Sequence, residues 1–358
     1  MNLEALAHEQ AKPRALGVAA ELPQLVQVHA HREFIGVWRE SDAVAAVGKH
    51  PVAIQGAGGG EQRRAYGKAL EHTAILALLL ALLWSGVAVA QDRFFDSRGV
   101  RIRYIEHGAG ASVVLIHGFT ANIERAWVQT EILPSLARDY RVVALDLRGH
   151  GESGKPHEPA AYDAIALDVI RLLDHLGIER THAAGYSLGG IILAKLLTTH
   201  PDRFRSPVLG GAAYRRSQSK EADEQTEAAA REIEAGIYRA LVVSTAPTDE
   251  PPPTEAQIRA RSLEITALND RFAHAALMRS RRALLVTDAE IAAVRVPTLA
   301  IVGGADPAAP RVQAMQKRWP GLEVVVVPGA AHPTVHARGL PRNPEFAAAI
   351  RRHIARQP

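Results

Sequence analysis

The stretch HAAGYSLGGIILAKLL, His182–Leu197, decides the fold of this chain. Its first residues are small and apolar, as in a strand buried on both faces, and the residues from Leu188 onward are typical of a buried helix. Between them, positions 185–189 follow the pattern G-x-S-x-G. A sharp turn from strand to helix needs glycine on both sides of the serine and lifts its hydroxyl clear of the sheet edge. The stretch therefore predicts an exposed, nucleophilic Ser187.

Short β-type runs alternate with helical runs from Gln91 onward. We expect about eight strands, within 94–97, 100–108, 112–118, 141–149, 182–187, 207–211, 297–306 and 322–332. The near-continuous apolar character of several runs and their alternation with helices predict an α/β fold. Its sheet is mostly parallel and has helices on both faces. In such sheets, ligands bind beyond the carboxyl ends of the strands.

One long segment, Ala212–Glu290, breaks this alternation. It shows no strand pattern, and the stretches 221–241 and 254–285 suit amphipathic helices. We interpret it as a helical cap inserted between two strands and lying over the strand ends. Elsewhere, helices are expected over 126–139, 161–177 and 188–200.

A serine needs a base, and the base needs an orienting acid, before it becomes a good nucleophile. Two strand ends after Ser187 carry such groups: Asp306 follows one apolar run and His332 follows the next. The order Ser, Asp, His is the one that accompanies this turn in parallel sheets. Asp146 also ends a strand, but it precedes the serine, and we interpret it as a structural carboxylate that holds the RGHG turn.

Two main-chain N–H groups are candidates for stabilising an oxyanion. Leu188 lies at the start of the helix after the serine, and Phe119 follows His117-Gly118 at the end of an earlier strand. His117 is expected to brace this loop rather than act as a base. The pocket walls are expected to include Phe119, Thr120 and Tyr186.

These motifs together resemble the α/β-hydrolase superfamily. The matching segments are HGF at 117–119, DLRGHGES at 146–153, GYSLGG at 185–190, GGADP at 303–307 and GAAH at 329–332. The resemblance implies a helical cap and the catalytic triad Ser187, His332 and Asp306. It implies an oxyanion hole from the N–H groups of Phe119 and Leu188, with no cofactor and no metal. Haloalkane dehalogenases and epoxide hydrolases of this superfamily carry aspartate at the position of Ser187.

The expected activity is hydrolysis of a small-molecule carboxylic ester through an acyl-enzyme. The same triad also serves hydrolysis of lactones, amides and carbon–carbon bonds, and perhydrolysis. A non-catalytic binding protein on the same scaffold is the alternative from another class. Substrate identity and oligomeric state are left open.

Composition excludes several other classes. The formal net charge is only +4 over 358 residues, without long runs of like charge, so nucleic-acid binding is not expected. The chain has 0 cysteines, which excludes disulfides, thiolate nucleophiles and zinc–thiolate sites.

The region before Gln91 predicts export. An apolar run, Ala74–Trp84, follows basic residues and precedes the small-x-small site Ala88–Ala90. The run is short for a membrane span, which needs ~20 apolar residues. We therefore expect residues 67–90 to be a signal peptide cleaved after Ala90, giving a secreted or periplasmic protein. The alternative is a membrane anchor through 74–90. We interpret residues 1–66 as an extension, either disordered or an artefact of the gene model.

Overall fold

The computed structural model describes residues 92–214, 219–333 and 337–357. The expectations for the extension 1–66 and for the signal peptide or anchor at 67–90 lie outside these residues. The eight strands of the sheet are β1 Arg93–Asp96, β2 Arg101–His107, β3 Ser112–Ile116, β4 Arg141–Leu145, β5 Thr181–Tyr186, β6 Phe204–Gly210, β7 Thr298–Gly303 and β8 Leu322–Val327.

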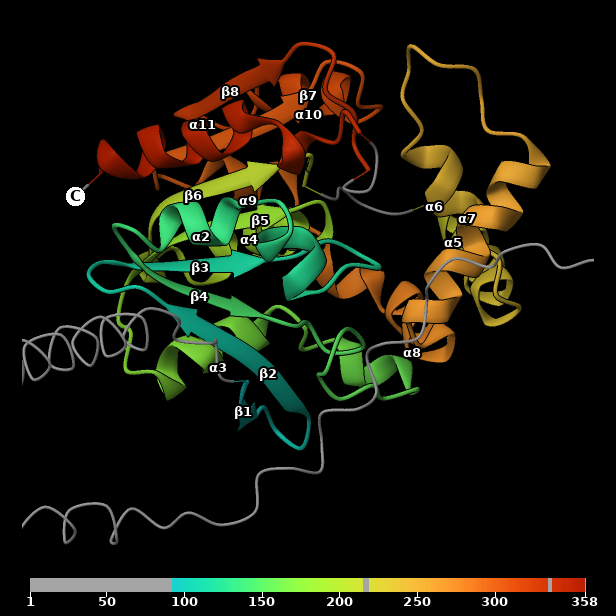
Figure 1. Ribbon diagram of the computed structural model, residues 1–358, viewed down its shortest axis with the longest axis horizontal. Helices are drawn as coiled ribbons and strands as arrows, with labels where there is room; N and C mark the ends of the chain where they lie inside the picture. Colours follow the sequence, from blue (N-terminus) through green and yellow to red (C-terminus); the bar gives the residue numbers. More distant parts are fainter. Residues whose placement is uncertain (1–91, 215–218, 334–336, 358) are drawn as a thin grey trace, which may run out of the picture. The chain divides into compact units, whose positions relative to one another are not determined.

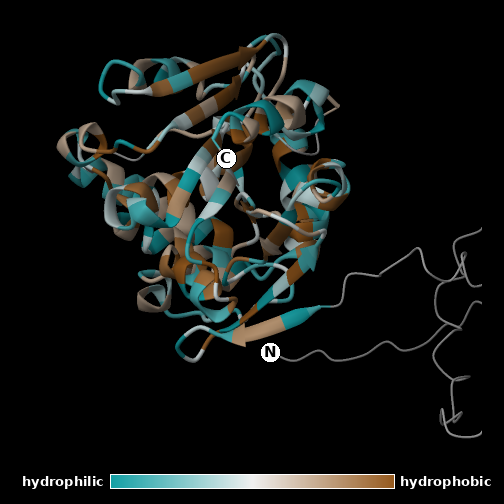
Figure 2. Cartoon of the chain, turned by 90° about the vertical axis from the view of Figure 1, so that its left-hand side faces the viewer, coloured by the Kyte–Doolittle hydropathy of each residue, from teal (hydrophilic) through white to brown (hydrophobic). Residues whose placement is uncertain are grey.

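The sheet has the order β1-β2-β4-β3-β5-β6-β7-β8. Only β2 with β1 and β2 with β4 pair antiparallel, while β4, β3, β5, β6, β7 and β8 run parallel to one another. This confirms the predicted mostly parallel sheet. Figure 2 shows hydrophobic residues along the strands, whereas the surrounding helices carry both hydrophobic and hydrophilic residues.

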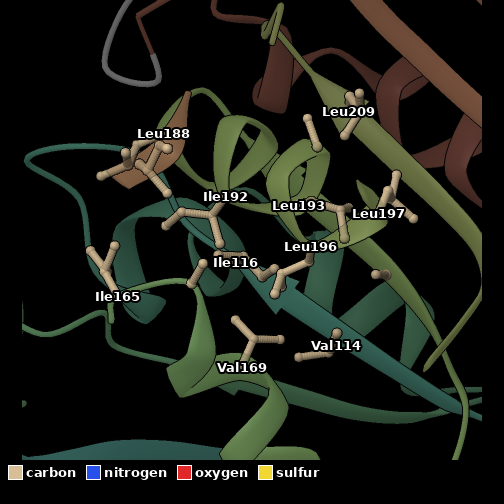
Figure 3. Packing of buried hydrophobic residues seen from close by; sticks show 14 of the residues in the cluster. Val114, Ile116, Ile165, Val169, Leu188, Ile192, Leu193, Leu196, Leu197 and Leu209 are labelled. Atoms are coloured by element: carbon tan, nitrogen blue, oxygen red, sulfur yellow. The ribbon is translucent and has the colours of Figure 1, made fainter. Parts of the chain in front are cut away.

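Helices cover both faces of the sheet because successive strand residues point to opposite sides. From β3, Val114 and Ile116 belong to one buried cluster that includes residues of α3 (Leu167–His175), α4 (Leu188–Thr199) and α10 (Ala309–Met315). Figure 3 shows the apolar face of α4 on this side. On the other side, Val113 and Leu115 belong to a second cluster with residues of α2 (Ile132–Leu136) and α11 (Pro344–Ala355).

Two predicted helices differ from the structure. The helix expected over 126–139 is wrong as a single element: a π-helical turn η1 (Glu124–Val128) precedes α2, and Glu131 between them has a left-handed φ of 60°. The helix expected over 161–177 begins only at Leu167, after a 3₁₀ turn η2 (Pro159–Tyr162). There the Ile165 N–H donates to the Tyr162 carbonyl at 3.0 Å, a 3₁₀-type bond, while the Ala161 carbonyl accepts from the Arg148 guanidinium.

The segment between β6 and β7 is helical where it is described, as expected. We call its elements the insertion helices: α5 Lys220–Glu234, α6 Arg239–Ser244, α7 Glu255–Leu268, α8 Arg271–Arg279, η4 Arg281–Leu284 and α9 Asp288–Ala292. Figure 1 shows α5 to α8 beyond the arrowheads of β3 and β6. Among the described residues, no helix combines the length and hydropathy of a membrane span. Two further 3₁₀ turns, η3 Pro201–Arg203 and η5 Leu340–Arg342, complete the elements.

Candidate active site

Ser187 lies in a strained turn between β5 and α4. Its φ of 53° and ψ of −111° fall outside the regions that residues with a side chain normally occupy. The Ser187 N–H donates to the carbonyl of Gly210 in β6 at 2.8 Å, and the Ser187 carbonyl accepts from Ile191 in α4 at 3.0 Å. Backbone strain of this kind persists only where the surrounding structure enforces it, and it is typical of functional sites.

Close backbone contacts explain the two glycines of the motif. A Cβ added to Gly185 would lie 2.3 Å from the carbonyl oxygen of Gly189. A Cβ added to Gly189 would lie 2.0 Å from the carbonyl oxygen of Ile116 in β3. Both distances are far below van der Waals contact, so α4 can start this close to the sheet only with glycine at 185 and 189.

His332 contacts both other members of the predicted triad. Its Nε2 lies 3.0 Å from Oγ of Ser187, and its Nδ1 lies 2.7 Å from Oδ2 of Asp306. A carboxylate oxygen only accepts, so Nδ1 carries the imidazole proton and Nε2 presents its lone pair to the serine hydroxyl. The structure therefore brings together three side chains separated by up to 145 residues.

Asp306 is held in place from both sides. The residue is 2% exposed, and Oδ1 accepts a hydrogen bond from the N–H of Ala308 at 2.7 Å, while Oδ2 faces His332. The carboxylate lies at the end of β7 and before α10. Its two oxygens therefore have separate partners, and the one facing His332 is kept in a defined position.

Tyr186 supports His332. The tyrosine is 2% exposed, its hydroxyl donates to the main-chain carbonyl of His332, and the two ring centroids are 5.5 Å apart. Burial, and after it the Asp306 carboxylate, raise the pKa of Tyr186 well above its ordinary value, so the hydroxyl keeps its proton. These contacts favour a positioning role for Tyr186 over the expected role as a pocket wall.

Two main-chain N–H groups near Ser187 are free. Among the hydrogen bonds of the described residues, none is donated by the N–H of Phe119 or of Leu188. Gly118, just before Phe119, lies so close to the nucleophile that an added Cβ would be 3.2 Å from Cβ of Ser187. Thr120, which follows, has a φ of 63° and is partly exposed. We call residues 118–120 the loop beside Ser187.

His117 and Asp146 brace the surroundings of the site, as expected. The Nδ1 of His117 donates to the Gly118 carbonyl at 2.8 Å, and its Nε2 accepts from the N–H of Leu147 at 3.0 Å. The buried Asp146 carboxylate accepts from the N–H groups of Ile123 and Glu152, both at 2.9 Å. Neither side chain has a contact that would assign it to proton transfer at Ser187.

The insertion helices contribute aromatic contacts that the sequence did not predict. The Phe119 ring centroid lies 4.5 Å from that of His274 in α8 and 6.4 Å from that of Tyr238, just before α6. Tyr238 and His274 belong to no motif, and no periodicity identifies them. They become visible only because the insertion helices pack against the loop beside Ser187.

Comparison with known proteins identifies the family of the chain. A family model described as the alpha/beta hydrolase fold matches residues 111–336. The chain belongs to the α/β-hydrolase fold family. The match includes Ser187, Asp306 and His332 within its bounds, and it begins just before β3.

Individual relatives of this α/β hydrolase match over shorter stretches. The dihydrolipoyllysine-residue acetyltransferase component of the acetoin cleaving system from Cupriavidus necator is 41% identical over 123 residues, which is 34% of this chain and 32% of that protein. A fluoroacetate dehalogenase from a Burkholderia species is 36% identical over 117 residues, which is 31% of this chain and 38% of that protein. The matched part of the chain thus spans about a third of these relatives.

Among solved structures, a thermophilic esterase from Thermogutta terrifontis, with malate bound, superposes with a TM-score of 0.59. It covers 75% of this chain and 99% of its own, at 23% identity. At this identity the likeness concerns the fold.

Proposed function

We propose that this α/β hydrolase cleaves a carboxylic ester through a covalent acyl-enzyme on Ser187. The observation that carries the proposal is the position of the His332 imidazole, 3.0 Å from the Ser187 hydroxyl and 2.7 Å from the Asp306 carboxylate. This is the relation of nucleophile, base and orienting acid that acyl transfer to serine requires.

The reaction has two stages. In the first, Oγ of Ser187 attacks the ester carbonyl as its proton moves to Nε2 of His332, and the N–H groups of Phe119 and Leu188 donate to the oxyanion. The imidazolium, stabilised by Asp306, then protonates the leaving alcohol. In the second stage, His332 takes a proton from water, the hydroxide attacks the acyl carbon, and Oγ of Ser187 leaves with a proton from His332.

The serine at 187 supports ester hydrolysis over the reactions of some relatives. The resemblance to the superfamily implies aspartate at this position in epoxide hydrolases and haloalkane dehalogenases, whereas this chain has serine. The insertion helices, which we propose act as a cap, contact Phe119 and would shape the pocket.

Labelling with a fluorophosphonate and a panel of p-nitrophenyl esters tests the proposal. The unmodified protein is expected to be labelled and to release p-nitrophenol, and Ser187→Ala is expected to lose both. His332→Ala is the second variant, expected to lower kcat/KM by at least about 10³-fold. Labelling that persists in Ser187→Ala would remove this serine from the mechanism. A labelled protein that cleaves lactones or amides but no ester would favour those alternatives.

A further inference from the structure

Two imidazole nitrogens near the loop beside Ser187 have no hydrogen-bond partner among the described residues. They are Nε2 of His150, after β4, and Nε2 of His274, in α8. Both histidines are 0% exposed. A buried polar atom without a partner is unfavourable, so such atoms in native proteins commonly meet a ligand group or an ordered water.

The two rings lie together at the boundary between the sheet domain and the insertion helices. Their centroids are 4.5 Å apart, and both rings contact Phe119, at 5.8 Å for His150 and 4.5 Å for His274. Gly118 of the same loop lies against the nucleophile, since a Cβ added there would be 3.2 Å from Cβ of Ser187. We call His150 and His274 the buried histidine pair.

His150 presents an acceptor. Its Nδ1 lies 3.1 Å from the carbonyl oxygen of Arg148, which only accepts, so Nδ1 carries the proton. Burial, followed by the neighbouring His274 and His117, holds the pKa of His150 well below its ordinary value. The ring is therefore neutral near pH 7, and its Nε2 has a free lone pair.

His274 presents a donor. Its Nδ1 lies 3.0 Å from the hydroxyl of Tyr238, for which the described residues provide no other partner. The hydroxyl is satisfied when it donates to Nδ1, and the proton of the neutral imidazole is then on Nε2. Burial lowers the pKa of His274 to about 3, which keeps the ring neutral near pH 7.

A metal ion does not suit this cluster. The third nearby imidazole, His117, has both nitrogens engaged with main-chain groups. Within the described part of the chain, no group of three or more His, Asp or Glu side chains is arranged to hold a metal. The free atoms are therefore one donor and one acceptor.

We propose that the buried histidine pair binds a hydroxyl group of the substrate. A hydroxyl accepts from Nε2–H of His274 and donates to Nε2 of His150, whereas a carboxylate or a ketone can use only the donor. This inference rests on the proposed function and specifies its substrate class: an ester that carries a hydroxyl group on its acyl or alcohol part.

Matched esters test the proposal. Ethyl hydroxyalkanoates with the hydroxyl at successive carbons are compared with ethyl alkanoates, and hydroxyalkyl acetates with alkyl acetates. Hydrolysis is followed by proton release. The unmodified protein is expected to favour one hydroxylated ester by about tenfold or more in kcat/KM, since two hydrogen bonds to buried partners are at stake. The position of that hydroxyl tells whether the acyl or the alcohol part is recognised.

Asparagine variants isolate the two free nitrogens. In His150→Asn and His274→Asn, the side-chain amide can replace Nδ1 in its existing hydrogen bond, but no atom takes the place of Nε2. The preference is expected to fall towards equality in both variants. His353→Gln is the control. His353 is also buried, and its Nε2 contacts the Pro297 carbonyl, so this variant is expected to keep the preference. Thermal melting of each variant confirms folding.

Two results would overturn the proposal. One is a protein that does not distinguish hydroxylated esters from their matched esters, as expected if the pair holds only a water. The other is a preference that survives in both asparagine variants.

Calorimetry on Ser187→Ala with the same ester pairs gives a binding readout that is independent of catalysis. Tighter binding of a hydroxylated ester supports the pair, and equal binding contradicts it. Loss of fluorophosphonate labelling on Ser187 bears only on the proposed function.

Discussion

The hydroxyl of Tyr186 donates a hydrogen bond to the main-chain carbonyl of His332, which lies 146 residues later in the chain. Tyr186 directly precedes Ser187, so one residue of the tight turn also holds the segment that carries the imidazole. Its ring adds contacts with His332 and with Phe346 of α11. The position of the nucleophile and the position of the proposed base are therefore coupled through a single side chain.

Removing this hydroxyl is expected to reduce activity as well as stability. Tyr186→Phe should lower the free energy of unfolding by about 1 kcal/mol and kcat/KM by about tenfold, because the His332 segment loses its fixed position. Denaturant unfolding and ester hydrolysis measure the two effects. Tyr162→Phe is the matched control, since its buried hydroxyl donates to the Pro156 carbonyl at 2.8 Å. Equal loss of activity in both variants would contradict a specific role for Tyr186.

A methyl group at Gly189 is expected to disrupt the turn. In Gly189→Ala the new Cβ would meet the Ile116 carbonyl oxygen at 2.0 Å, so α4 must move away from β3. We expect destabilisation by about 3 kcal/mol or more and loss of fluorophosphonate labelling. Gly177→Ala is the control: its φ of 64° is strained for alanine, but no atom lies within 4 Å of the added Cβ. It should cost about 1 kcal/mol and keep labelling. A Gly189→Ala protein of normal stability would contradict the close contact.

Acid is expected to destabilise the protein through its buried histidines. Burial lowers the pKa of His274 to about 3, from an ordinary value near 6.5. Below pH 6.5 the unfolded chain therefore binds a proton that the folded chain does not, and stability falls until the pH approaches the folded pKa. This one group should remove about 2 kcal/mol between pH 7.5 and pH 5. Burial also lowers the pKa values of His117 and His150, so they act in the same direction.

Urea unfolding at the two pH values measures this effect. The loss between pH 7.5 and pH 5 should be about 2 kcal/mol smaller in His274→Asn than in the unmodified protein. An identical pH dependence in the two proteins would contradict the lowered pKa. It would show that His274 takes up its proton over the same pH range in the folded protein as in the unfolded chain.

The region before Gln91 gives a prediction on export. We propose that residues 67–90 act as a signal peptide, so the exported protein should begin at Gln91. Expression in a bacterial host, separation of periplasm and membranes, and N-terminal sequencing test this. Ala90→Arg, which removes the small residue at the cleavage site, is expected to leave the chain uncleaved. An unmodified protein found in membranes with residues 74–90 still attached would favour an anchor.

Local patterns in the sequence predicted the strands better than the helices. β3, β5 and β7 are predicted by near-continuous apolar runs, and such a run can be recognised from a few neighbouring residues alone. The helix expected over 126–139 fails at Glu131, where the left-handed backbone separates η1 from α2. Pro134 in the first turn of α2 is a sequence signal for this break, because proline has no N–H to donate to the carbonyl of Thr130. The break arises where Ala126, Trp127, Ile132 and Leu136 are all buried against the sheet. The local proline and the burial of both short helices therefore agree with two elements rather than one.

The sequence by itself determined the turn around Ser187 and the placement of Asp306 and His332 at later strand ends. These features are short-range, because glycine beside a serine and apolar runs before polar residues are properties of a few neighbouring positions. Only the tertiary structure decided that His332 lies within hydrogen-bond distance of both partners, that Tyr186 holds it, and that His150 meets His274. Such contacts join segments far apart in the chain, and their distances depend on how the sheet and the insertion helices pack.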